Sequence, residues 1–161
     1  MRTAQLQIRL TPVEKAAIER AARQAGVGMS AYVLGKALPS QEGQWRALLG
    51  GVSRAAGGRV AFASLSSWLA GLGTAEMRVA VQAPPPAGLS AFDANTVAAM
   101  VEYSCAARGV EPPPWTRGIE PLARPVFGSE LASLRLHLLT NSPAPFRRRN
   151  LFVDTAVGGQ V

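Results

Sequence analysis

Near the start of the chain, side chains able to pair with DNA bases recur at every second position, as Gln5, Gln7 and Arg9. In the major groove of DNA, glutamine can pair with adenine through two hydrogen bonds, and arginine can pair with guanine in the same way. The positions between them and after them are apolar, and they are Leu6, Ile8 and Leu10. This alternation predicts a β-strand with one polar and one apolar face. The polar face therefore presents side chains that can contact DNA bases.

A helix is expected directly after this strand. Thr11 and Glu14 have the spacing of a capping box, and Pro12 suits the first helical position. The helix is expected to run to about Ala25 and to end at Gly26, because glycine favours the conformation that closes a helix.

A second helix is expected to start at Ser30 as its cap and to end near Leu38. Met29 and Leu34 are placed as a hydrophobic staple across that cap. The first amides of a helix have no partner within it, so those near Met29, Ser30 and Ala31 are predicted to bind a DNA phosphate.

One strand and two short helices bury too little surface to fold alone. Two copies that pair their strands as an antiparallel ribbon would bury Leu6, Ile8 and Leu10 as a dimer core. Gln5, Gln7 and Arg9 would then project from a two-stranded ribbon that fits the major groove of double-stranded DNA. The alternative is that residues 5–10 form an ordinary edge strand in a mixed domain.

The segment QLQIRLTPVEKAAIERAARQAGVGMSAYVLGKAL, within residues 4–38, resembles the ribbon-helix-helix segment of two protein families. One contains the antitoxins that pair with acetyltransferase toxins, and the other the plasmid-mobilisation accessory proteins that help a relaxase at a transfer origin. The resemblance lies in RLTPVE and in SAYV after a loop of small residues. It implies base contacts by Gln5, Gln7 and Arg9 and phosphate contacts around Ser30. Gly28 and Met29 depart from the pattern, which has one more polar residue in this loop.

The rest of the chain, residues 41–161, is predicted to be mostly helical, so the fold class is mainly α. Helices are expected over about 41–56, about 93–108 with Asp93 as the cap, and from Ser129 to Leu139. Residues 59–82 are ambiguous, with a short helix over 64–72 and a weak strand over 77–81. A tri-proline segment marks a possible break at residues 83–88.

A basic cluster with aromatic residues on both sides lies near the end of the chain, and it comprises Phe146, Arg147, Arg148, Arg149 and Phe152. Its arginines could pair with acidic groups on a protein partner or with nucleic acid. The alternative is a solvated basic turn beside two buried aromatic rings.

No motif indicates catalysis, and we expect a protein that is not an enzyme and that needs no metal or cofactor. His137 is the one histidine and is expected on a helix face, while Cys105 is expected to be a core thiol. A single cysteine fits a reducing cytoplasm, and no apolar run is long enough to span a membrane. The net charge of +7 favours an anionic partner.

Three functions follow from these features. The first is an antitoxin-type repressor that binds its operator as a homodimer and neutralises a toxin through residues 41–161. The second is a plasmid-mobilisation accessory protein with the same DNA-binding arm and a relaxase as its partner. The third is a protein-interaction module whose first strand extends the sheet of another protein.

Overall fold

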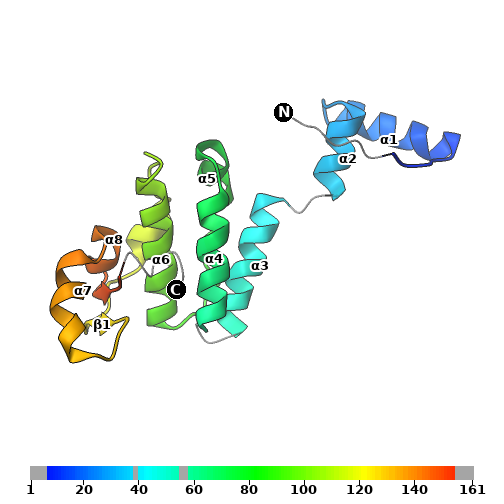
Figure 1. Ribbon diagram of the computed structural model, residues 1–161. Coiled ribbons are helices and arrows are strands. Elements are labelled where there is room, and N and C mark those ends of the chain that lie inside the picture. The colour runs from blue at the N-terminus through cyan, green and yellow to red at the C-terminus, as the bar shows by residue number, and fades with distance from the viewer. Residues whose placement is uncertain (1–6, 38–39, 55–57, 155–161) are drawn as a thin grey trace. The chain divides into compact units, whose positions relative to one another are not determined.

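The computed structural model describes residues 7–37, 40–54 and 58–154 (Figure 1). The chain divides into two compact units, Met1–Ser40 and Gln41–Val161. Helices dominate both units, which confirms the prediction of a mainly α protein.

The N-terminal unit holds α1 (Pro12–Gln24) and α2 (Met29–Ala37), which pack against each other. The capping box predicted at Thr11 is confirmed. The Glu14 N–H donates to Thr11 Oγ1 at 3.3 Å, and the Thr11 N–H donates to Glu14 Oε2 at 2.8 Å. Gly26 follows α1 with a φ of +68°, a conformation that residues with a side chain rarely adopt.

Two details of this unit differ from the sequence-based predictions. Residues 7–10 carry no regular secondary structure in the single chain, so the predicted strand is not shown, and Gln5 and Leu6 lie outside the described residues. The second helix begins at Met29, which places Ser30 inside its first turn and not at the cap. The first intrahelical hydrogen bond runs from the Tyr32 N–H to the Gly28 carbonyl, at 2.9 Å.

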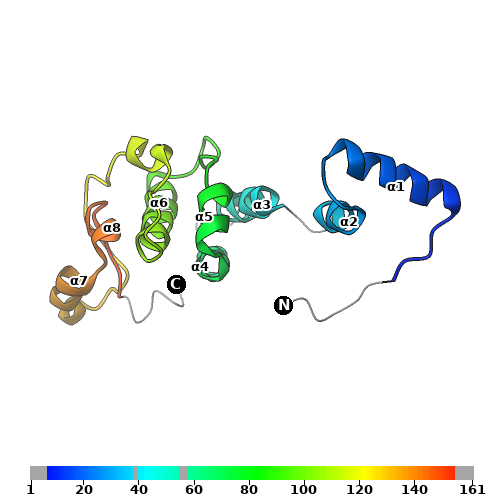
Figure 2. The same cartoon turned by 90° about the horizontal axis from the view of Figure 1, so that it is seen from above.

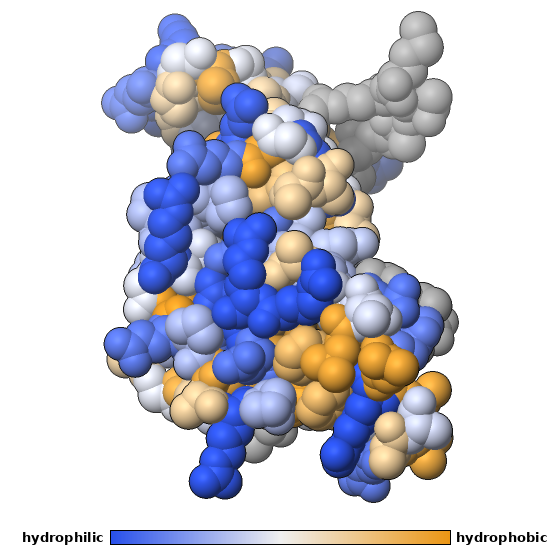
Figure 3. Space-filling view, turned by 90° about the vertical axis from the view of Figure 1, so that its left-hand side faces the viewer, coloured by the Kyte–Doolittle hydropathy of each residue, from blue (hydrophilic) through white to orange (hydrophobic). Residues whose placement is uncertain are grey.

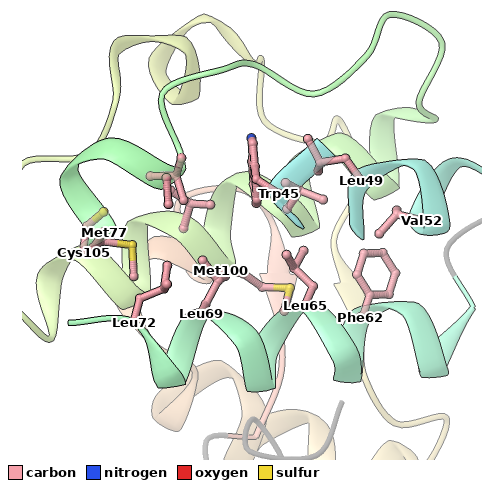
Figure 4. Close-up of a cluster of buried hydrophobic side chains, with 14 of the residues drawn as sticks. Trp45, Leu49, Val52, Phe62, Leu65, Leu69, Leu72, Met77, Met100 and Cys105 are labelled. Carbon is pink, nitrogen blue, oxygen red and sulfur yellow. The ribbon is translucent and has the colours of Figure 1, made fainter. Parts of the chain in front are cut away.

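The C-terminal unit begins with four helices, α3 (Gln41–Arg54), α4 (Arg59–Gly71), α5 (Thr74–Ala80) and α6 (Ala91–Ala106). Both α4 and α5 pack on α3, and α4 also packs on α6, so that α4 and α6 lie side by side in two perpendicular views (Figures 1 and 2). Apolar faces of these helices form one core, which includes Trp45, Leu65, Met77 and Cys105 (Figure 4).

Residues 77–81, predicted as a weak strand, instead lie in and directly after α5. Met77, Ala80 and Val81 are buried, and this spacing of three and four residues matches one face of a helix. The Gly73 N–H also donates to Glu76 Oε2 at 2.8 Å, which stabilises a helical start. Packing therefore outweighs the weak alternation that indicated a strand.

Ser90, and not Asp93, caps α6. The Asp93 N–H donates to Ser90 Oγ at 3.1 Å, and Ser90 Oγ in turn donates to Asp93 Oδ2 at 2.7 Å. Asp93 occupies the third helical position, where a carboxylate favours the positive end of the helix dipole.

The tri-proline segment is a loop between α5 and α6. The indole Nε1 of Trp45 donates to the Ala83 carbonyl at 2.8 Å, and the Trp45 ring stacks on Trp68 at 5.9 Å. Residues before and after the loop belong to the same hydrophobic cluster. The loop thus connects two parts of one core.

The end of the described chain is built from short elements. In order, they are the 3-10 helix η1 (Pro114–Gly118), β1 (Val126–Phe127), the 3-10 helix η2 (Ala132–Leu134), α7 (Arg135–Asn141), α8 (Ala144–Arg147) and β2 (Leu151–Phe152). The two strands pair in parallel, and α8 packs on α6. The helix predicted from Ser129 starts later, at Arg135, directly after η2. Ser129 Oγ accepts from the Leu131 N–H in the segment before η2.

In the part of the chain that the structure describes, no helix is both long and apolar enough to cross a membrane.

Candidate nucleic-acid interface

The polar side chains of the predicted ribbon stand directly before α1. Gln7 and Arg9 are both exposed. The capping box at Thr11 fixes the path of the chain where this segment enters the helix. The hydrogen bonds that Glu14 accepts from the Thr11 backbone and side chain hold the pKa of its carboxyl below the usual value. Glu14 is therefore ionised at neutral pH and its negative charge lies in the first turn of α1.

The described apolar side chains of the same segment lack cover in the single chain. Ile8 is 56% exposed and Leu10 is 42% exposed, and Val13 at the start of α1 is 77% exposed. Ala22 is the one buried residue among those described up to Ala37. A helix pair with so little core gains little free energy from burial, so covering these side chains would add much of its stability.

The first turn of α2 presents backbone amides. Because Tyr32 makes the first intrahelical bond, the amides of Met29, Ser30 and Ala31 precede it. All three residues are exposed, and the first turn of α2 contains no acidic residue. A phosphate oxygen could bind here without repulsion from a carboxylate.

Positive charge is concentrated in the first unit. Residues 1–40 contain six Lys and Arg against two Glu, a net charge of +4 out of +7 for the chain. One of these cations, Lys15, lies 3.9 Å from the Glu19 carboxylate on the helix surface. An excess of basic residues over a short segment favours a polyanionic partner.

The basic cluster near the end of the chain is not one surface. Arg147 and Arg148 are exposed, but Arg149 is buried and donates to the Glu102 carboxylate, so its predicted role as a partner contact is wrong. Phe152 is buried and stacks on Phe127 at 5.1 Å. Phe146 is half-buried and meets the Tyr103 ring edge-on at 6.3 Å. The two rings are thus partly or wholly core residues.

Sequence reasoning missed the polar groups that hold Arg149. Asn95 and Glu102 lie on α6 seven residues apart, which puts both on the same side of the helix. Asn95 Oδ1 accepts from Arg149 Nη1 at 3.2 Å. The available signal was this spacing of Asn95 and Glu102, two helical turns apart in α6. Among the described residues, no three His, Cys, Asp or Glu side chains gather as a metal site would require.

Comparison with known proteins supports one of the expected families. Residues 1–40 match a family model described as NikA-like, mobilization protein NikA. No match to the chain was found among curated proteins or among solved structures. The match covers the N-terminal unit alone, and it favours the plasmid-mobilisation alternative over the antitoxin interpretation, which nothing in the comparisons supports.

Proposed function

We propose that this chain is a DNA-binding accessory protein of plasmid mobilisation and not an enzyme. In this proposal two copies pair residues 5–10 as an antiparallel ribbon that enters the major groove of a transfer origin. The observation that carries it is the family match over residues 1–40.

The geometry of the N-terminal unit supports a dimer that binds DNA. Pairing through residues 5–10 would cover Ile8 and Leu10, which are exposed in the single chain, and would leave Gln7 and Arg9 facing outward. The first turn of α2 would contact the phosphate backbone on either side of the ribbon. These contacts would fix the register of the ribbon, while the amide and guanidinium groups would select the sequence.

The test uses the full-length chain and short duplexes that tile the DNA flanking its gene, with binding followed by fluorescence anisotropy. One duplex is expected to bind far more tightly than the others and to contain two related half-sites, because a symmetric dimer prefers a symmetric site. Its affinity should fall steeply as salt rises, since bound phosphates release counterions.

Arg9→Ala is expected to weaken binding to that duplex by about 1–3 kcal/mol and to relax the preference at one base step. Arg78→Ala is the matched control, because Arg78 is also an exposed arginine but lies on α5 in the other unit. Equal binding to every duplex, or an Arg9→Ala protein that discriminates as well as the wild type, would refute the proposal.

A further inference from the structure

A long apolar groove crosses one side of the C-terminal unit. It encloses about 600 Å³ between α4, α6 and the segment that contains β1, α8 and β2. One face of α4 lines it, represented by Arg59, Phe62 and Ala70. One face of α6 and its C-cap residue also line it, represented by Phe92, Met100 and Ala107. This volume lies within the range that is common for ligand-binding sites in proteins.

The groove follows both helices for most of their length. Arg59 and Ala70 are eleven residues apart on α4, which corresponds to about 17 Å along the helix axis. Such a span matches about three turns of a further helix laid against α4 and α6. Large aromatic side chains line it, and Phe92 and Tyr103 remain 40% and 44% exposed. An amphipathic helix that buries one face in an apolar groove is a common mode of protein recognition.

An arginine side chain lies beside the groove at each end of α4. Arg59 is exposed in the first turn of the helix. At the other end the Arg108 guanidinium donates to the carbonyls of Leu69, Ala70 and Leu72, at 2.7 to 3.0 Å. These carbonyls bear no formal charge, so the bonds hold Arg108 in place, and the negative end of the α4 dipole offsets only part of its positive charge. One acidic residue, Asp154, also lines the groove, compared with the two arginines. Its Oδ2 atom lies 3.4 Å from His137 Nε2.

From this arrangement we propose that the groove binds an amphipathic helix of about three turns from a partner protein, with acidic residues near its ends. The apolar face of that helix would pack on Phe62, Phe92 and Met100, and its carboxylates would face Arg59 and Arg108. The proposal stands apart from DNA binding, because all of these residues belong to the C-terminal unit.

A second copy of this chain fits the groove less well. One apolar segment that a second copy could offer from the same unit surrounds α7, where Leu131, Leu134, Leu136 and Leu139 are exposed. Figure 3 shows the face at this end of the unit, where apolar and strongly hydrophilic side chains lie next to each other. However, α7 carries Arg135 and contains no acidic residue, so it would bring positive charge toward a positively charged groove.

The experiment selects peptides of about 16 residues from a random display library on the full-length chain and measures the Kd of the best ones by fluorescence anisotropy. Selected peptides are expected to carry apolar residues three and four positions apart and a net negative charge. Ala70→Trp, which fills the groove from an exposed position, should weaken binding about tenfold or more, and so should Ala107→Trp.

Charge is tested by Arg59→Glu, which should weaken binding several-fold while keeping α4 intact, because an acidic residue suits a helix N-terminus. Arg78→Glu is the matched control and should change the Kd by less than about twofold. Circular dichroism melting of each variant confirms that it is folded.

Three outcomes would overturn the proposal. The first is a selection that yields no binder, or binders with no acidic bias. The second is peptides that bind the tryptophan variants as well as they bind the wild type. The third is a different occupant, shown either by self-association that Ala70→Trp abolishes or by peptides that bind only after residues 155–161 are deleted.

Discussion

The Arg149 guanidinium and the Glu102 carboxylate form an ion pair, 2.5 Å apart, with only 6% and 15% of their side-chain surfaces exposed. The same guanidinium donates to the carbonyls of Thr116 and Ile119, at 2.7 and 3.3 Å. One side chain therefore connects the turn after α8 to α6 and to η1. These contacts make Arg149 a structural residue of the C-terminal unit, although the sequence places it in a run of three arginines.

Removal of the Arg149 charge should strongly destabilise the C-terminal unit. Arg149→Met leaves the largely buried Glu102 carboxylate without its cationic partner, and breaking a buried ion pair in this way costs about 3–5 kcal/mol. Urea denaturation followed by circular dichroism measures the change in the free energy of unfolding. Arg148→Met is the matched control, because Arg148 is exposed, and it should stay within about 0.5 kcal/mol of the wild type. Equal effects of the two substitutions would contradict the role given to Arg149.

Ile8→Asp should prevent dimerisation of the full-length chain. The pairing proposed for residues 5–10 buries Ile8, and a carboxylate buried there without a partner would be strongly unfavourable. Sedimentation equilibrium at micromolar concentration is expected to give a dimer for the wild type and a monomer for the variant. Gln7→Asp, which changes a neighbouring residue on the outward face, should leave the dimer intact. A wild-type protein that sediments as a folded monomer would disprove the pairing.

Local signals predicted the parts of the fold that local interactions determine. The start of α1 follows from Pro12 at the first helical position and from the hydrogen bonds between Thr11 and Glu14, which are three residues apart. The apolar face of α6, including Val101 and Cys105, follows from helical spacing within one segment. In both cases the residues that decide the structure are close together in the sequence.

Long-range contacts determine what the sequence did not predict. Arg149 is buried because Glu102, 47 residues earlier, accepts its hydrogen bonds, and no pattern within RRR distinguishes it from Arg148. Met77 lies in a helix because the core formed by distant residues covers one face of α5. The groove of the C-terminal unit is likewise a product of how α4 and α6 pack, since each helix alone has only an apolar face.

Cys105 should react slowly with thiol reagents in the native protein. Burial raises the pKa of the Cys105 thiol, opposed by the nearby Arg108 charge and reinforced by Glu102, so little thiolate forms at neutral pH. Titration with an aromatic disulfide reagent is expected to show almost no reaction at pH 7 and rapid reaction of one thiol per chain in denaturant. The slow native rate should rise with pH, because a raised pKa keeps the thiol protonated further into the alkaline range. Rapid native reaction would mean that the thiol is accessible.

The backbone amides at the start of α1 should lose protection from hydrogen exchange in acid. Because the folded state lowers the pKa of Glu14, the capping box contributes stability above the ordinary pKa of this carboxyl and loses it as pH falls through the lower, folded-state value. The Lys15 N–H, which donates to the Thr11 carbonyl at 3.0 Å, reports on this turn by hydrogen exchange. Its protection factor, corrected for intrinsic exchange, should fall in acid in the wild type.

In Glu14→Gln the protection factor of the Lys15 N–H should be lower at neutral pH and insensitive to acid over the same range. Glu19→Gln is the control, since Glu19 makes only a surface ion pair with Lys15 and should preserve the acid dependence. The same pH profile in wild type and Glu14→Gln would show that the Glu14 carboxylate does not stabilise the helix start.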